Sequence, residues 1–199
     1  MPELPEVETT LRGIEPHILN KKITSVTVRN PSLRWPVPED SLKTNLIDNS
    51  FISIRRRGKY LILESQNGFV LIHLGMSGHL CIVPKNRKIK KHDHIDIEFS
   101  NKDHQIICYN DPRRFGCILW TEENPLNHKL IKNLGPEPLT DNFNVSYLFK
   151  KLRKKGFSAS SILSYIREPI NFYYKKILKI PDELKVEETI ESNTLGTVI

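Results

Sequence analysis

The chain has 199 residues, 38% of them hydrophobic, and a formal net charge of +7 at pH 7. That length and composition allow a buried core and exclude a chain that is disordered throughout. Its three cysteines lack C-x-x-C spacing, which argues against a disulfide framework and a four-cysteine zinc site. No apolar run approaches the roughly 20 residues that span a bilayer, so we expect a cytoplasmic protein without a membrane partner.

The positive charge is unevenly distributed along the sequence. Residues 182–199 carry five acidic side chains and one lysine, so residues 1–181 hold a net charge of +11. A surplus of this size suits a polyanion such as nucleic acid, although many basic proteins bind none.

Residues 2–19 are predicted to form a helix. Val7, Leu11, Ile14 and Ile18 recur at helical spacing and would share one face. Pro5 is tolerated in a first turn, and acidic residues there suit the positive end of the helix dipole. We therefore expect the amino end of the chain to be held against a core.

Between residues 23 and 120 the pattern changes to short β-type runs separated by turn signals. The runs are Val26/Val28, Ile52/Ile54, 60–63, 69–74, 95–99, 106–109 and 117–120. Many short strands at this spacing predict an antiparallel sandwich. The expected fold class is α+β: an N-terminal helix plus an antiparallel β-sandwich, followed by a short partial helical region.

The carboxyl-terminal part begins at residues 134–138, L-G-P-E-P, which are predicted to be an interdomain linker. Residues 145–155 then fit a basic helix with Leu148, Phe149 and Leu152 on its apolar side. A short helix around residues 162–166 would end before Pro169.

The amino terminus offers a chemical group of its own. Methionine before proline is usually removed, and Pro2 would then be a terminal secondary amine. An α-amino group has an ordinary pKa of roughly 7.7–8.0, so a useful fraction is neutral and nucleophilic in the cell. Glu3 could move protons to and from a substrate, and Glu6 could help hold the amine. The alternative is an ordinary N-terminal helix with acids in its first turn.

Other segments of the sequence favour the catalytic interpretation of Pro2. Six short segments stand out in the sequence: P-E-L-P-E-V-E (2–8), R-R-R-G-K-Y (55–60), H-L-G-M-S-G (73–78), K-H-D-H (91–94), D-P-R-R-F-G (111–116) and L-G-P-E-P-L (134–139). In order and spacing they resemble formamidopyrimidine-DNA glycosylase, over roughly residues 1–155. Six concurrent motifs make chance a poor explanation.

The resemblance implies a base-excision repair DNA glycosylase and AP lyase that acts on oxidised purines, 8-oxoguanine and formamidopyrimidine, in double-stranded DNA. Pro2 would attack C1′ of a flipped nucleotide and form a Schiff base, which then undergoes β- and δ-elimination. Glu3 would donate and accept protons at the sugar. Lys59 matches the family's catalytic lysine, which contacts phosphate and assists base removal.

The same resemblance implies a set of DNA-binding residues. Met76, Arg113 and Phe115 match the residues that fill the hole left by a flipped base, and His92 matches a phosphate-contacting histidine. The trio also separates this chain from endonuclease VIII, the pyrimidine-directed relative. Without the resemblance, Met76 and Phe115 would be assigned to the core, and His92 with His94 could be an H-x-H metal pair lacking nearby third and fourth ligands.

The resemblance ends near Lys155. Expected domains are a catalytic β-sandwich domain (1–132), a linker with the first helix of a helical DNA-binding domain (133–155) and a diverged tail (156–199). The family's zinc-finger cysteines have no counterpart after Cys117, so no metal or other cofactor is expected, and the chain is expected to be a monomer. A frameshift or truncation is the hypothesis for this ending, to be dropped if the gene shows no family-like frame after Lys155.

We expect glycosylase activity to be weak in a chain with this ending, because phosphate-contacting parts of the family are missing. The alternative is a catalytically inactive remnant with residual non-specific DNA binding.

Overall fold

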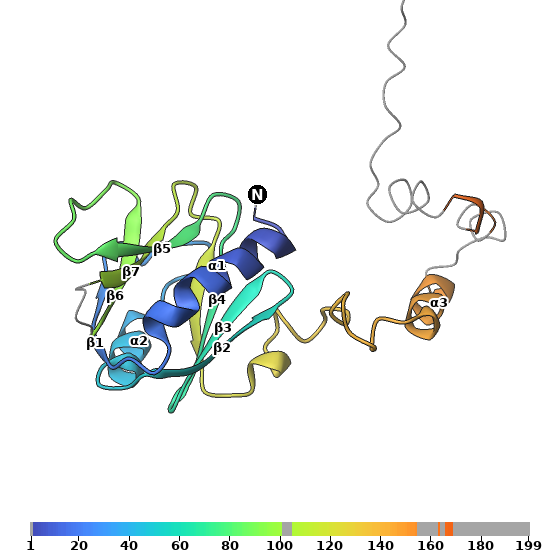
Figure 1. The fold of residues 1–199 in the computed structure, drawn as a ribbon, viewed down its shortest axis with the longest axis horizontal. Helices are drawn as coiled ribbons and strands as arrows, with labels where there is room; N and C mark the ends of the chain where they lie inside the picture. The colour runs from blue at the N-terminus through green and yellow to red at the C-terminus, as the bar shows by residue number, and fades with distance from the viewer. Residues whose placement is uncertain (1, 101–104, 155–162, 164–165, 169–199) are drawn as a thin grey trace, which may run out of the picture. The chain divides into compact units, whose positions relative to one another are not determined.

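The computed structural model describes residues 2–100, 105–154, 163 and 166–168. The chain divides into two compact units, residues 1–137 and 138–199, which are described separately. The first unit contains the helices and both sheets that carry the predicted site (Figure 1).

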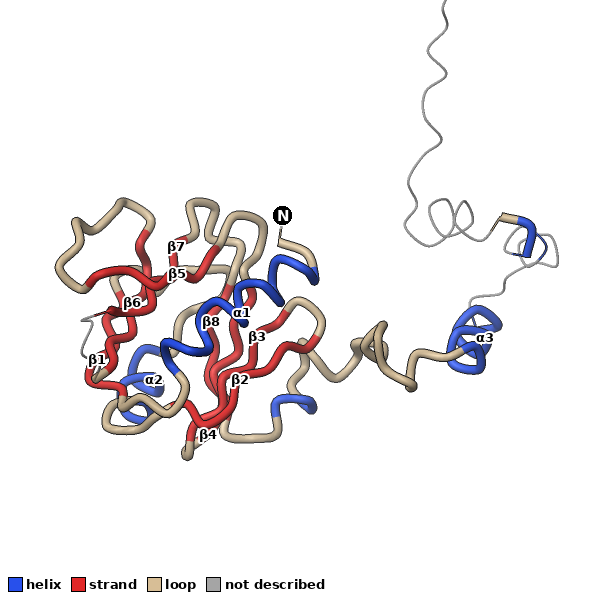
Figure 2. Tube along the Cα trace, in the orientation of Figure 1, coloured by secondary structure: helices blue, strands red, loops and turns tan. Residues whose placement is uncertain are grey.

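Two four-stranded antiparallel sheets form the first unit (Figure 2). One sheet has the order β1-β6-β7-β5, with bounds Ile23–Val28, Asp93–Phe99, Gln105–Asn110 and His79–Pro84. The other has the order β2-β3-β4-β8, with bounds Phe51–Arg57, Tyr60–Ser65, Gly68–His73 and Cys117–Thr121. Helix α1 (Leu4–Ile18) packs against strands of both sheets, and α2 (Glu39–Leu46) packs against β1. The predicted α+β class is confirmed.

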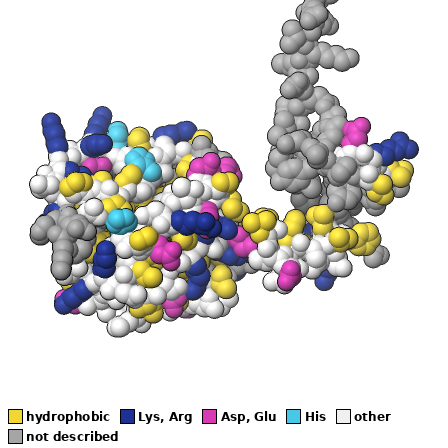
Figure 3. All heavy atoms as spheres, viewed as in Figure 1, with side chains coloured by type: hydrophobic (Ala, Val, Ile, Leu, Met, Phe, Trp, Pro, Cys, Tyr) yellow, Lys and Arg dark blue, Asp and Glu magenta, His cyan; other side chains and the backbone are white. Residues whose placement is uncertain are grey.

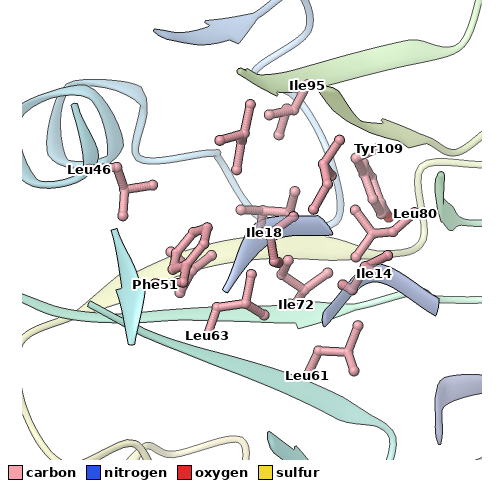
Figure 4. Close-up of a cluster of buried hydrophobic side chains, with 14 of the residues drawn as sticks. Ile14, Ile18, Leu46, Phe51, Leu61, Leu63, Ile72, Leu80, Ile95 and Tyr109 are labelled. Atoms are coloured by element: carbon pink, nitrogen blue, oxygen red, sulfur yellow. The ribbon is translucent and has the colours of Figure 1, made fainter. Parts of the chain in front are cut away.

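The core lies between the two sheets and under α1. Ile14 and Ile18 of α1 meet Leu63 of β3 and Ile95 of β6 in one cluster (Figure 4). Every residue of the predicted apolar face of α1 is buried, so burial of this face anchors the amino end of the chain.

The two central strands of the second sheet, β3 and β4, are buried on both faces. Leu61 and Leu63 face the main core, whereas Ile62 packs with Leu71 and Ile131 on the opposite face. This explains why residues 60–63 form a continuous apolar run rather than an alternating one.

Three details differ from the sequence prediction. Strand β5 and helix α2 were not predicted. Within β2, the buried side chains are Phe51 and Ile54, whereas Ile52, which shares a predicted β-type run with Ile54, is 46% exposed. The pairing with β3 shifts register between Phe51 and Ser53, and this irregularity turns Ile52 outward.

The second unit begins after Glu137. It contains α3 (Val145–Lys154), where a basic helix was predicted. The short helix predicted around residues 162–166 lies largely outside the described residues. The domain boundary at residue 132 stays a prediction, while residues 133–137 belong to the first compact unit.

Candidate functional site

Four predicted site residues meet at the amino end of α1. Glu3 is the N-cap of the helix, and its backbone N–H donates to Glu6 Oε2 at 2.9 Å. Both Glu3 carboxylate oxygens accept from Lys59 Nζ, at 2.9 and 2.8 Å. Pro2 directly precedes Glu3 and is partly exposed. Pro2 therefore adjoins a carboxylate that is paired with an ammonium, and solvent can reach both charged groups.

Lys59 is presented by the tight turn between β2 and β3. Gly58 has φ +56°, a left-handed conformation that favours glycine. Its backbone N–H donates to Glu137 Oε1 at 2.6 Å, and Arg57 Nη1 donates to the same oxygen at 2.8 Å. Glu137 thus fixes the backbone of the turn that carries the lysine.

Arg56 joins this turn to α1. Its Nε donates to Glu8 Oε2 at 2.9 Å, and its Nη1 donates to Glu137 Oε2 at 2.8 Å. The pKa of Glu137 is lowered, because the Gly58 N–H, Arg56 and Arg57 outweigh the opposing effect of burial. The pKa of Glu8 is lowered by Arg56 and Arg12. This network holds the turn that carries Lys59 close to α1, where Lys59 pairs with Glu3. Glu8, Arg56 and Glu137 were not predicted to have a role.

The predicted intercalating residues form a second group. Met76, between β4 and β5, is 40% exposed, and Phe115, between β7 and β8, is 46% exposed. The guanidinium of Arg113 lies 4.8 Å from the centre of the Phe115 ring. The Arg113 backbone N–H donates to Ser77 Oγ at 3.2 Å, which ties the two loops together. Neither Met76 nor Phe115 is a core residue.

A buried carboxylate, Asp111, supports these loops. It is 0% exposed and accepts from Ser77 Oγ at 2.6 Å, the Gly116 N–H at 2.9 Å and Tyr109 Oη at 3.2 Å. The Arg113 N–H approaches the same carboxylate at 3.3 Å. These donors hold the pKa of Asp111 below its ordinary value although burial acts to raise it. Sequence reasoning missed Asp111, although it opens the quoted D-P-R-R-F-G motif.

The two loops approach each other backbone to backbone. Gly75 has φ +65°, and a Cβ on it would lie 2.4 Å from the Gly116 nitrogen. A Cβ on Gly116 would lie 1.9 Å from Tyr109 Oη. Both positions therefore require glycine.

His73 lies between the two groups of site residues. Its Nδ1 accepts from the Gly75 N–H at 2.9 Å, so that nitrogen carries no proton. Burial lowers the pKa of His73, and the positive charges of Arg34 and Lys59 lower it further. A neutral His73 thus supports the Met76 turn from the side of Lys59.

His92 is joined to the same frame through the backbone. Its carbonyl accepts from the Asp111 N–H at 3.2 Å, and its ring centre lies 6.3 Å from that of His94. His94 is buried, and its Nε2 lies 2.7 Å from the Asp111 carbonyl oxygen. Among the described residues, no group of three or more His, Cys, Asp and Glu side chains could hold a metal ion. The absence of a cofactor stays a prediction.

The first unit is thus an N-terminal helix on two antiparallel sheets, with Pro2 next to the Glu3–Lys59 pair and with Met76, Arg113 and Phe115 exposed on its loops. The model of the formamidopyrimidine-DNA glycosylase N-terminal domain matches residues 1–118. The chain therefore belongs to the formamidopyrimidine-DNA glycosylase family.

Individual relatives agree with this assignment. The formamidopyrimidine-DNA glycosylase of Saccharophagus degradans is 53% identical over 161 residues, which cover 81% of this chain and 58% of the relative. That of Haemophilus influenzae (strain PittEE) is 51% identical over 163 residues, covering 82% and 58%. The chain thus spans a little under three fifths of the length of these curated relatives.

Solved structures with DNA show the same fold. The Lactococcus lactis formamidopyrimidine-DNA glycosylase, non-covalently bound to DNA containing an AP site, matches with a TM-score of 0.69 and 33% identity, over 77% of this chain and 58% of that chain. MutM in complex with DNA containing carbocyclic 8-oxo-G matches with a TM-score of 0.69 and 35% identity, over 77% and 57%.

In the described part of this chain, no helix is both long and apolar enough to cross a membrane.

Proposed function

We propose that this chain is a base-excision repair enzyme that removes oxidised purines from double-stranded DNA and cleaves the resulting abasic site. The observation that carries the proposal is the meeting of Glu3 and Lys59 beside Pro2, with 2.8 and 2.9 Å contacts between the ammonium and both carboxylate oxygens. The family membership and the DNA complexes of the relatives support the same substrate.

The proposed chemistry begins with Pro2 as a free secondary amine after loss of Met1. Its lone pair forms a bond to C1′ of the flipped nucleotide, the bond from C1′ to the base breaks, and the departing base takes up a proton. The amine loses its proton, the bond from C1′ to the ring oxygen O4′ breaks, and O4′ takes up a proton, which leaves an iminium ion between Pro2 and C1′. In this proposal Glu3 delivers and accepts the protons that these steps require.

Elimination follows from the iminium ion, which acidifies the C2′ hydrogens. A base removes one of them, and the 3′-phosphate leaves in β-elimination; a second elimination releases the 5′-phosphate. Lys59 contributes a positive charge beside the reacting sugar and its phosphates. The exposed Met76 and Phe115 side chains are apolar wedges for the space left by the flipped base, and Arg113 offers donors to the base opposite.

Borohydride trapping tests the proposal directly. The full chain, shown by mass spectrometry to lack Met1, is mixed with duplex DNA containing 8-oxoguanine opposite cytosine, and borohydride reduces any Schiff base to a stable adduct. We expect an adduct with the parent, and a reduced adduct or none with Pro2→Gly or with protein that retains Met1. Pro5→Ala is the matched control, because Pro5 is an exposed proline three residues along the chain, in the first turn of α1.

The outcomes separate the alternatives. An adduct that forms to the same extent with Pro2→Gly as with the parent would overturn the role of Pro2. Duplex binding without any adduct would identify the inactive remnant. Stronger trapping on an oxidised pyrimidine than on 8-oxoguanine would point to endonuclease VIII-like specificity. The monomeric state and the cytoplasmic location stay predictions.

A further inference from the structure

The loop between β5 and β6 carries an uninterrupted run of positive charge. Residues 85–91 have the sequence K-N-R-K-I-K-K, which is five cationic residues and no acid. The loop precedes His92, the predicted phosphate contact. Only part of this charge is neutralised within the protein.

Two of the five cations form ion pairs within the protein. Arg87 is 13% exposed and donates from Nη1 to Asp93 at 3.2 Å and from Nη2 to Asp96 at 2.9 Å. Both aspartates are buried in β6. Lys85 pairs with Glu98 at 2.6 Å. These contacts anchor the first half of the loop to the outer face of the sheet.

The other three, Lys88, Lys90 and Lys91, are exposed, and none forms an ion pair within the described residues. We call them the lysine strip. The backbone beneath the strip is fixed, because the Lys90 N–H donates to Asp93 Oδ2 at 2.8 Å and the Asp93 N–H donates to the Lys90 carbonyl at 3.1 Å. The strip therefore consists of three lysines without an ion-pair partner among the described residues, and hydrogen bonds to Asp93 fix the backbone at Lys90.

The strip continues the predicted DNA-binding surface. Lys90, Lys91 and His92 line a hollow of about 450 Å³ together with His79 and Asn110. The β5–β6, β7–β8 and β4–β5 loops and the amino end of α1 all open toward the upper edge in Figure 1. Basic and histidine side chains are visible along that edge in Figure 3.

We propose that the lysine strip binds the phosphate backbone of duplex DNA beyond the His92 contact. This inference rests on the proposed function for the identity of the duplex. Residues 88–91 span at most roughly 10 Å, which is the rise of about three phosphates along one strand. A row of that length suits a polymer of phosphates better than a single small anion.

The test is the salt dependence of binding to an undamaged duplex, measured by fluorescence anisotropy with the full chain. Each phosphate contact contributes about 0.9 to the slope of log K against log salt, so replacing Lys88, Lys90 and Lys91 by Gln lowers the slope by about 2–3. Between 50 and 200 mM salt, the affinity of the variant then falls about 40-fold less than that of the parent. Circular dichroism confirms that both are folded.

The matched control replaces Lys22, Lys129 and Lys132 by Gln, which removes the same charge from exposed positions outside the loop. Equal slopes for the strip variant and this control would overturn the proposal, as would a parent that does not bind the duplex. So would loss of binding to anionic vesicles with DNA binding unchanged. A reduced slope in a protein that fails borohydride trapping would sink the proposed chemistry and leave the strip standing.

Discussion

Asp111→Asn tests whether one buried carboxylate holds the loops that carry Met76 and Arg113. An asparagine offers one oxygen and one NH₂ group where the aspartate offers two oxygens. If the amide NH₂ takes the Oδ2 position, it faces the Gly116 N–H and leaves that buried donor unpaired. If it takes the Oδ1 position, it faces the Arg113 N–H, which keeps its bond to Ser77 Oγ. Because either orientation removes the charge and leaves fewer acceptors for the four donors, we expect about 2–4 kcal/mol less stability.

Urea unfolding followed by tryptophan fluorescence measures this loss. The chain contains two tryptophans, Trp35 and Trp120, and both belong to the first compact unit. Because the pKa of Asp111 lies below its ordinary value, its contribution is full above about pH 4 and is lost as the pH falls through the lowered pKa. The difference between parent and variant should therefore shrink below about pH 4.

The control for Asp111→Asn is Asp40→Asn, the same chemical change at an exposed position in the first turn of α2. We expect it to cost at most about 1 kcal/mol. Equal stability of the Asp111 variant and the parent at pH 7 would refute the role of the carboxylate. A stability difference that persists unchanged below pH 4 would refute the assigned ionisation.

Three further predictions concern the neighbouring contacts. Glu137→Gln removes the charge from the bonds to Arg56, Arg57 and Gly58 and should lower the urea midpoint by an amount equivalent to about 2 kcal/mol, with an unchanged m value. His73→Asn keeps an acceptor for the Gly75 N–H but does not titrate. Because burial lowers the pKa of His73, the parent should lose stability as the pH falls below about 6.5. Urea unfolding at pH 7.5, 6.0 and 5.0 should show a smaller loss of stability in the variant. Phe115→Ala changes a half-exposed side chain, so stability should move by less than about 0.5 kcal/mol while the affinity for lesion DNA falls; a variant that unfolds early would place Phe115 in the core instead.

The parts of the fold that followed from the sequence are those set by local periodicity. Helix α1 repeats apolar residues at helical spacing, and each of them is buried. Strand β5 escaped because it is an edge strand with only Leu80 fully buried, so its sequence need not alternate clearly. Helix α2 has only two buried residues, Leu42 and Leu46, in eight positions, which leaves little periodic signal.

The candidate site, like the fold, could be predicted from the sequence only in part. The motifs predicted the residues proposed to contact the substrate. They did not predict the supporting residues, because these act over long sequence separations. Glu137 binds Arg56 across 81 positions, and Ser77 binds Asp111 across 34. Pairings of this kind depend on how two sheets and their loops come together, and no local pattern records them.

The supporting residues also explain how, in the proposed reaction, the nucleophile Pro2 and the wedge Met76 act on the same nucleotide. The Glu8–Arg56–Glu137 network fixes the turn of Lys59 against α1, and Asp111 fixes the loops of Met76 and Arg113. His73 lies where the two frames meet: it binds the Gly75 backbone, and its pKa responds to Lys59 and Glu3. A nucleophile must hold its distance from a flipped sugar while a wedge fills the duplex, so rigid attachment of both groups to one pair of sheets is a physical requirement of the proposed reaction.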